Sequence, residues 1–374
     1  MFKLYENVPV LPISQVLGSP HGRSEHKLGP IWPDWEKCEE ERFKRKGKVK
    51  DDCPELQENE KLTYKTGNFF WGGPIVNHFG HQIADFSTRL IMYSELKMKG
   101  KFVFSVRKGS GFGKNDVPAF FVAILEWFQI DIDQVLFVES PMLLEKLWVC
   151  GQQEQLPQEG PSDLYLQKLD ENAKQQGTFS ENKEGRFYIS RSNIPNGVIA
   201  GERYIENYLE LHGITIIRPE NMKLREQLEI YSKAKELVFG EGSALHGLQL
   251  LGHIKSDVHI LCRRPNHLMS KMFLTKRCKT LRYYPAGELV CGINAVGQPA
   301  MSTGITIAQT NKISDLFKIL KISLDSWSES EFKQSIKEDV FNYLDRESDT
   351  PRAKIPNYID IIEHKLKSLG VYSH

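Results

Sequence analysis

Apolar and polar positions alternate along the chain in patterns that predict regular elements from about residue 74 onward. Residues 1–65 are polar, contain prolines and show weak periodicity, which predicts an irregular amino-terminal layer. From about 74 to 99, apolar residues recur at steps of three and four, which predicts one long helix entered through a turn at Gly72–Pro74. Strand, helix and strand patterns follow at 102–106, 118–128 and 135–138. This order predicts a parallel α/β sheet.

A second alternating series follows a polar segment at about 151–185 that is rich in Gln, Glu and Gly and typical of a domain boundary. The series predicts a second doubly wound unit. Helical patterns at the end of the chain predict helices that pack back across the first domain. The predicted strands are 186–190, 214–217, 236–239 and 257–262, and the predicted helices are 201–212, 222–234, from 243, about 267–276, 313–322 and 355–370. We therefore expect an α/β protein with domains at 1–180 and 181–325 and a helical extension at 326–374.

Composition limits the partners and the location of the chain. Lys and Arg number 49 against 48 Asp and Glu, so the formal charge of +1 gives no overall field for a nucleic acid. The basic run 41–50 has acidic flanks, which favours a solvated loop over a membrane-surface patch. No stretch approaches the roughly 18 apolar residues of a membrane span, and the amino terminus lacks an apolar signal segment. We expect a cytoplasmic protein, with peripheral attachment to the inner membrane face left open.

Cysteines and acidic motifs predict no metal site and no disulfide. Six scattered cysteines without a CxxC pair predict free thiols in a reducing compartment. Asp131 and Asp133 form a DxD motif of the kind that binds a divalent ion in metal-dependent transferases, but they precede a predicted strand instead of following one. This places them at the wrong sheet edge for a ligand, so we interpret them as a polar turn.

The segment WGGPIVNHFGHQIADFSTRL contains the first candidate site. On the predicted helix, Asn77, His81, Asp85 and Arg89 follow one another at four-residue steps, on a face distinct from the apolar stripe. A carboxylate one turn away can hold an imidazole in one tautomer, ready to take a proton from a hydroxyl. His81 and Asp85 are therefore the catalytic candidates, and which of them is the base stays open. Asn77, His78 and Arg89 are candidate acceptor contacts, and the alternative is an ordinary solvated His–Asp pair.

The segment ELVFGEGSALHG contains the second candidate site. It predicts a strand, a glycine turn and a helix capped by Ser243, and helix amino termini bind phosphate groups. Gly240 and Gly242 would remove side-chain obstruction, and His246 would lie in the first turn of the helix, within reach of the ligand. The alternative is a capped helix without a ligand.

Arginines after the predicted strands form the third candidate site. Arg191 directly follows the strand 186–190, and Arg203 and Asn207 lie one turn apart on the next helix. Arg263 and Arg264 follow another strand, so these residues should cluster at the carboxyl edge of the sheet, where open α/β sheets bind ligands. Guanidinium groups suit a diphosphate. The alternative is surface arginines that cap loops.

Taken in order, these motifs resemble glycosyltransferase family 61, the capsular polysaccharide and O-glycan transferases, over about residues 70–320. Each motif is loose, but several in the same order are specific. This chain departs from the pattern at Glu241, where many members have a histidine. The matching positions are Trp71, Asn77, His81, Asp85, Ser190–Arg191, Arg203–Asn207, Pro219–Glu220 and Gly240–His246.

The resemblance implies a GT-B fold, with two Rossmann-like domains facing a cleft, and an inverting transfer of sugar from a nucleotide sugar to a glycan. We expect a UDP-sugar donor, no cofactor and no metal, with Arg191, Arg203 and the turn at Gly242–Ser243 neutralising the leaving diphosphate. Bacterial capsule or surface polysaccharide synthesis is the implied setting. The alternatives are a non-catalytic glycan- or nucleotide-binding module, and another enzyme type such as a sugar epimerase or a phosphoryl transferase. The donor sugar, the acceptor, the linkage and the oligomeric state stay open.

Overall fold

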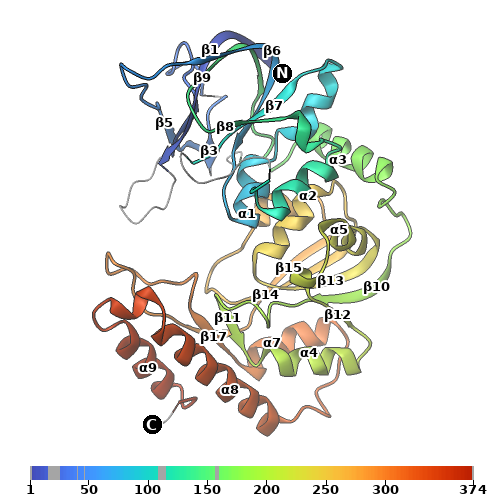
Figure 1. Ribbon diagram of the computed structural model, residues 1–374. Helices are drawn as coiled ribbons and strands as arrows, with labels where there is room; N and C mark the ends of the chain where they lie inside the picture. The colour runs from blue at the N-terminus through green and yellow to red at the C-terminus, as the bar shows by residue number, and fades with distance from the viewer. Residues whose placement is uncertain are drawn as a thin grey trace.

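The computed structural model describes residues 2–15, 26–39, 41–45, 47–107, 115–155 and 160–372. The described chain forms two α/β halves that pack against each other (Figure 1). We call residues 2–155, which contain a seven-stranded sheet, the first half, and residues 184–372, which contain a five-stranded and a three-stranded sheet, the second half.

The sheet of the first half is mixed, with the strand order β5-β2-β1-β9-β6-β7-β8. Its long strands β1 and β9 pair antiparallel, whereas β6 pairs parallel with β9 and β7. The first domain is therefore not the parallel doubly wound unit that we expected. The strands are β1 Phe2–Gln15, β2 His26–Pro30, β5 Asp51–Asp52, β6 Thr63–Pro74, β7 Lys101–Ser105, β8 Val135–Val138 and β9 Met142–Cys150.

The irregular layer predicted for residues 1–65 is wrong, because β1 lies inside this sheet between β2 and β9. Val8 and Val10 alternate inward in the period of a strand and are buried. The residue between them is Pro9, and a proline argues against a strand, so the sequence hides that alternation. The basic run 41–50 is also not a fully solvated loop, since Phe43 is buried and β3 (Lys44–Arg45) and β4 (Lys48–Val49) pair with each other.

The single long helix predicted for 74–99 is wrong as well. Gly73 and Pro74 continue β6 and pair with β7, so they are not a turn. Three short helical pieces follow: α1 Phe79–His81, a π-helical turn η1 Gln82–Phe86 and a 3₁₀ helix η2 Leu90–Leu96. His81 and Asp85 remain one turn apart, whereas Asn77 and Arg89 fall outside α1 and η1.

The second half contains the parallel sheet that the sequence predicts, in the order β12-β10-β13-β14-β15. The first strand, β10, lies between the second and the third, which is a doubly wound arrangement with its switch point beside β10. Four of its strands were predicted, and β15 was missed. The elements are β10 Glu184–Ile189, α4 Glu202–Leu211, β12 Thr215–Ile217, η4 Pro219–Asn221, α5 Leu224–Lys233, β13 Ala234–Gly240, η5 Ser243–Leu250, β14 Asp257–Cys262, α6 Lys271–Leu274 and β15 Thr280–Pro285.

The carboxyl-terminal helices pack on the second half, not on the first half as predicted. The helix α8 contacts β11 and α4, and α9 contacts β16 (Figure 1). Phe332 and Tyr358 are buried there in one apolar cluster with residues of α4. The elements of this region are β11 Val198–Ala200, β16 Gly287–Val290, β17 Ile305–Ala308, α7 Thr310–Ile319, α8 Glu329–Ser348, η6 Pro351–Lys354 and α9 Tyr358–Ser368.

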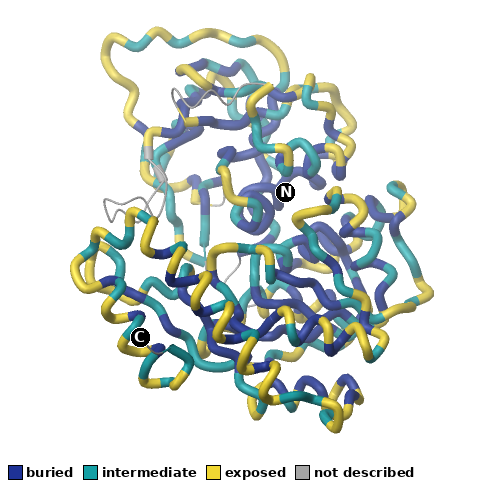
Figure 2. The backbone as a smooth tube through the Cα atoms, turned by 60° about the horizontal axis from the view of Figure 1, so that its bottom comes forward, coloured by how far each residue is buried: buried dark blue, intermediate teal, exposed yellow. Residues whose placement is uncertain are grey.

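A continuous apolar core joins the two halves. Figure 2 shows that buried residues occur in both of them. Trp127 of α2 (Ala119–Trp127) donates from Nε1 to the carbonyl of Leu250 at 3.0 Å. The segment that we interpreted as a polar boundary contains α3 (Asp163–Gln175), whose Tyr165 and Leu169 are buried in this core. The domain boundary near residue 180 therefore stays a prediction.

Two predictions are confirmed, one on Asp131 and one on the cysteines. Asp131 caps a short 3₁₀ turn, η3 (Ile132–Gln134), by accepting from the backbone of Asp133, and this turn precedes β8. All six cysteines are free thiols, and Cys262 is buried. Among the helices of the described ranges, none has the length and apolar character of a membrane span.

Candidate active site

A cavity of about 1620 Å³ lies between the two halves. α1 and η1 contribute residues from the first half, and the carboxyl ends of β10, β13 and β14 contribute residues from the second. The structure thus brings the whole of the second candidate site and parts of the first and the third to one cavity. The predicted residues that line the cavity are His78, His81, Asp85, Arg191, Gly240, Gly242, Ser243 and His246.

The other four predicted residues lie outside the cavity. Arg203 and Asn207 are exposed on the outer face of α4, because Ile205 and Leu209 turn the opposite face toward the core. Asn77 is exposed beyond the end of β6.

Arg89 is a structural residue. Its side chain is buried and donates to the carbonyl oxygens of Cys150 at 2.9 Å and Glu41 at 3.0 Å. On the buried face of α4, Glu206 pairs with Arg218.

His81 and Asp85 form the expected pair. Nδ1 of His81 lies 2.8 Å from Oδ2 of Asp85. A carboxylate only accepts hydrogen bonds, so Nδ1 of the neutral ring bears the proton and Nε2 has a lone pair. The imidazole is 41% exposed, whereas Asp85 is buried. The pair therefore presents a basic nitrogen, not a carboxylate, to the cavity.

Two glutamines that the sequence analysis missed hold Asp85 in place. The amide of Gln155 donates to Oδ1 of Asp85, and the amide of Gln152 donates to its backbone carbonyl at 2.7 Å. Both glutamines follow β9, in the polar segment that we interpreted as a domain boundary. No pattern in the sequence connects them with residue 85.

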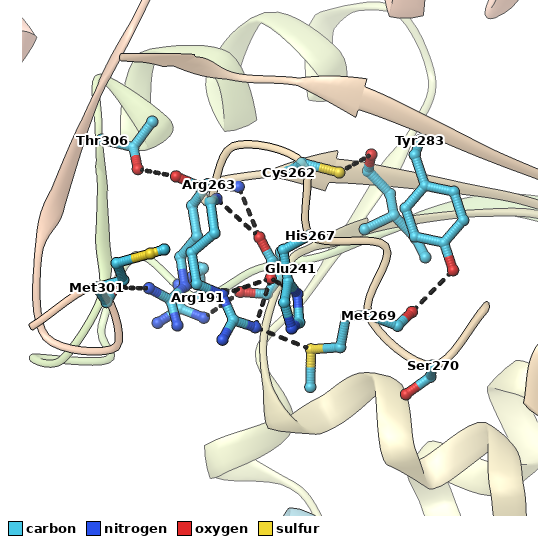
Figure 3. A network of polar contacts seen from close by, with 12 residues as sticks. Arg191, Glu241, Cys262, Arg263, His267, Met269, Ser270, Tyr283, Met301 and Thr306 are labelled. Atoms are coloured by element: carbon cyan, nitrogen blue, oxygen red, sulfur yellow. Dashed lines mark hydrogen bonds and ion pairs between the residues drawn. The ribbon is translucent and has the colours of Figure 1, made fainter. Parts of the chain in front are cut away.

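Arginines gather at the switch point of the second sheet (Figure 3). Arg191 follows β10 and donates to the carbonyl oxygens of Glu241 at 2.6 Å and Asn196 at 2.5 Å. Arg263 and Arg264 follow β14. Burial, together with the charges of Arg191 and Arg264, lowers the pKa of Arg263 to about 10. The cavity therefore has a wall with crowded, poorly solvated positive charge.

Glu241 connects this wall to the glycine turn. Its side chain is fully buried. It accepts hydrogen bonds from the backbone N–H groups of Arg263 at 2.9 Å and Arg264 at 3.0 Å. It also accepts from Nε of Arg264 at 2.7 Å and from Nδ1 of His267 at 2.9 Å (Figure 3). The sequence indicates neither this role of Glu241 nor the place of His267, which lines the cavity. A single histidine in a loop gives no signal of its own.

The glycine turn has neither the expected open space nor the expected cap, because Arg191 lies against both Gly240 and Gly242. A Cβ atom on Gly242 would lie 2.3 Å from Nη1 of Arg191, so a larger residue would displace that guanidinium. The N-cap of η5 is Gly242 rather than Ser243, and no side chain caps this helix. The turn therefore depends on Arg191 and Glu241 for its shape.

Glu202, on the buried face of α4, positions the backbone of Arg191. One of its oxygens accepts from the hydroxyl of Tyr188 at 2.8 Å and from the N–H of Arg191 at 2.9 Å, while the other is buried without a partner among the described residues. Burial raises the pKa of Glu202 from 4.5 to about 7, and Arg191 only partly opposes this. The neutral carboxyl is therefore favoured in the folded chain.

We expect this shift to make stability fall as pH rises. Between pH 4.5 and pH 7 the folded chain binds the proton of Glu202 more tightly than the unfolded chain, so each rise in pH in this window costs stability. The full effect is about 3 kcal/mol. Relative to wild type, the free energy of unfolding of Glu202→Gln should therefore increase by about this amount from pH 4.5 to pH 8, as measured by urea unfolding.

The control is Glu210→Gln, which removes an exposed charge of α4. An equal pH trend in both variants would contradict the assignment.

Comparison with known protein families gives a match to a family model. The family model described as Glycosyltransferase 61 matches residues 79–252, from the start of α1 to the end of η5. No curated protein matches the sequence. In the described part of the chain, no three His, Cys, Asp or Glu side chains converge as metal ligands would. The matched segment contains His81, Asp85, Arg191 and the turn from Gly240 to His246. The chain thus contains a glycosyltransferase family 61 domain at residues 79–252, and this domain indicates a glycosyltransferase, an enzyme that takes a sugar donor and a glycan acceptor.

Proposed function

We propose that the enzyme transfers a sugar from a nucleotide sugar to a glycan hydroxyl with inversion and without a metal, on a GT-B arrangement of its two halves. The observation that supports this proposal best is that one cavity has a candidate base on one wall and positively charged side chains on the opposite wall. The His81–Asp85 pair lies on the wall of the first half, and the arginines lie on the wall of the second half. The acceptor would therefore bind mainly to the first half and the donor to the second.

The arginine wall suits a diphosphate. The guanidinium of Arg264 pairs with the carboxylate of Glu241, whereas the guanidinium groups of Arg191 and Arg263 donate to the backbone carbonyl of Glu241. Nε of Arg191 is buried with no partner among the described residues. Fixed guanidinium groups in a poorly hydrated site stabilise the charge that develops on a leaving diphosphate, the task that a metal performs in other transferases. A UDP-sugar is the first donor to test.

The His–Asp pair suits the acceptor. In the proposed step, Nε2 of His81 takes the proton of the acceptor hydroxyl, and the oxygen attacks the anomeric carbon. The bond from that carbon to the diphosphate breaks, and its electron pair leaves with the diphosphate. One displacement of this kind inverts the configuration. Asp85 is the weaker candidate for the base, because it is buried and both of its oxygens accept hydrogen bonds from neighbouring side chains.

A screen of donors in the presence of EDTA tests the proposal. Purified protein is mixed with UDP-, GDP-, CMP- and dTDP-sugars, and thermal unfolding and release of free nucleotide are measured. We expect one nucleotide class to stabilise the protein and to be hydrolysed slowly in the chelator. Activity that requires added Mg²⁺ or Mn²⁺ would contradict metal independence. Binding without any turnover, in the presence of glycan acceptors, would favour a non-catalytic binding module on the same fold.

Synthesis of a bacterial capsule or other surface polysaccharide, at the inner face of the membrane, is the setting that we propose. The resemblance to capsular polysaccharide transferases supports it. Loss of surface glycan on deletion of the gene, restored by wild type but not by a His81→Ala copy, would be the matching result in cells.

A further inference from the structure

A line of buried polar side chains runs from the interior of the second half to the cavity. Arg277 and Glu154 form an ion pair in which neither side chain is exposed. Arg277 also donates to the carbonyl oxygens of Leu251 at 2.9 Å and Phe273 at 2.6 Å. The amide nitrogen of Gln249 donates to the second oxygen of Glu154. The line ends at His246, whose Nδ1 lies 2.6 Å from the amide oxygen of Gln249.

The chemistry of these groups fixes the tautomer of His246. A guanidinium stays charged. Burial raises the pKa of Glu154, but Arg277 opposes this shift and needs a carboxylate to balance its charge, so Glu154 is ionised and only accepts. Gln249 must then turn its N–H groups toward Glu154 and its oxygen toward His246. Because an amide oxygen also only accepts, Nδ1 of His246 must bear the hydrogen. In the neutral ring, Nε2 is left with its lone pair.

That lone pair lies where the two halves meet. His246 lines the cavity, and a Cβ atom on Gly80 would come within 2.6 Å of its Cδ2 and 3.2 Å of its Nε2. The edge of the ring that contains Nε2 is therefore next to α1 of the first half. Within the described residues, no side chain or backbone group forms a hydrogen bond with Nε2. The titratable groups that face the ring are His78, His81 and Asp85.

His246 and His81 thus differ in one respect. Both have a protonated Nδ1 and a bare Nε2. Nδ1 of His81 forms its hydrogen bond with a carboxylate, whereas Nδ1 of His246 forms its hydrogen bond with the neutral amide of Gln249. An imidazolium at His81 gains a charged partner, and one at His246 does not. Burial of the ring lowers the pKa of His246 to about 4, so this histidine stays neutral under ordinary conditions.

We infer that His246 is a neutral hydrogen-bond acceptor for a sugar hydroxyl bound between the two halves, and that Gln249 and Glu154 are positioning residues that hold its lone pair in place. The identity of the ligand as a sugar rests on the proposed transfer reaction. The tautomer does not, because it follows from the internal hydrogen bonds alone. The two parts of the inference can therefore be tested separately.

Nitrogen NMR of the full-length protein, labelled with ¹⁵N-histidine, tests the tautomer. We expect one histidine, identified by its loss in His246→Asn, to keep a protonated Nδ1 and a bare Nε2 from pH 5.5 to pH 8. In Gln249→Met, which removes the amide but keeps a similar volume, this fixed tautomer should be replaced by a mixture. A charged ring at pH 6, or a hydrogen on Nε2, would overturn the inference whether or not the protein transfers sugar.

Kinetics with the donor found in the screen test the role. In His246→Asn, the amide can place a donor where Nδ1 of the histidine lies, but it is too short to place an acceptor where Nε2 lies. In His246→Gln, the amide oxygen can take the place of Nε2. We expect His246→Asn to lose about 10- to 100-fold in kcat/KM, the size of one lost hydrogen bond, with much of it restored in His246→Gln. The pH profile should keep its wild-type shape in both variants.

The kinetics of His246→Asn also identify the substrate to which the hydroxyl belongs. A rise confined to the KM of the donor assigns it to the donor sugar, and a rise confined to the KM of the acceptor assigns it to the acceptor glycan. Wild-type efficiency in His246→Asn, or a lost limb in its pH profile, would overturn the role as a neutral acceptor.

Discussion

His81→Ala is expected to lower the kcat of sugar transfer by about 100- to 10,000-fold, the usual contribution of a positioned base. The bare Nε2 of this histidine faces the cavity, and the buried carboxylate of Asp85 would balance the proton that it takes up. Because the ring is partly exposed, its removal should leave the thermal unfolding temperature within a few degrees of wild type. Steady-state kinetics with the identified donor and an acceptor measure the effect.

The chain offers a matched control for this variant. Nδ1 of His253 lies 2.7 Å from Oδ2 of Asp170, and its side chain is 39% exposed, close to the 41% of His81. This second pair is not part of the cavity lining. His253→Ala should therefore keep its kcat within about twofold of wild type. Equal losses in both variants would mean that His81 acts only through stability, and near-wild-type turnover in His81→Ala would remove it from the mechanism.

Arg264→Met is expected to lower the kcat/KM for the donor by about 100- to 1,000-fold, as the loss of one fixed charge-stabilising group does in other active sites. The guanidinium lines the cavity, and Glu241 fixes its direction. Methionine keeps most of the aliphatic stem, so the change removes chiefly the charge. Calorimetric titration with UDP alone should show weakened binding as well, since the diphosphate is the group that the arginine would contact.

Arg203→Met is the control for the loss of one arginine charge. The sequence places Arg203 among the candidate donor contacts, but in the structure it is exposed on the outer face of α4. Its kcat/KM should stay within about twofold of wild type. If Arg203→Met were the more damaging change and Arg264→Met were harmless, the donor would bind elsewhere than at the carboxyl edge of the second sheet.

The parallel sheet of the second half could be predicted from the sequence because its central strands, β13 and β14, are mostly buried. Such strands appear as short continuous apolar runs, as in 236–239 and 257–262, and turns and helical patterns separate them. The carboxyl edge of that sheet then placed Arg191 and the glycine turn together, which the structure confirms. Four-residue spacing also paired His81 with Asp85 correctly, although the long helix assumed for it does not exist.

The remaining parts of the site depend on contacts that a local pattern does not contain. Gln152 and Gln155 reach Asp85 across 67 and 70 residues of chain, and Glu154 reaches Arg277 across 123. A glutamine in a polar segment resembles any solvated residue until the fold brings it to its partner. The same limit explains why Arg203 and Asn207 were wrongly predicted to lie in the site. Their family pattern contains no information on which face of α4 is buried.

The buried pair of Glu154 and Arg277 also limits how the enzyme can move. Glu154 follows the last strand of the first half, and Arg277 belongs to the second half, so the pair joins the two sheets on one side of the cavity. Separating them would leave two unpaired charges in a poorly hydrated interior, at a cost of about 3–5 kcal/mol. We therefore expect this side to act as the pivot during product release, with the gap widening on the opposite side of the cavity.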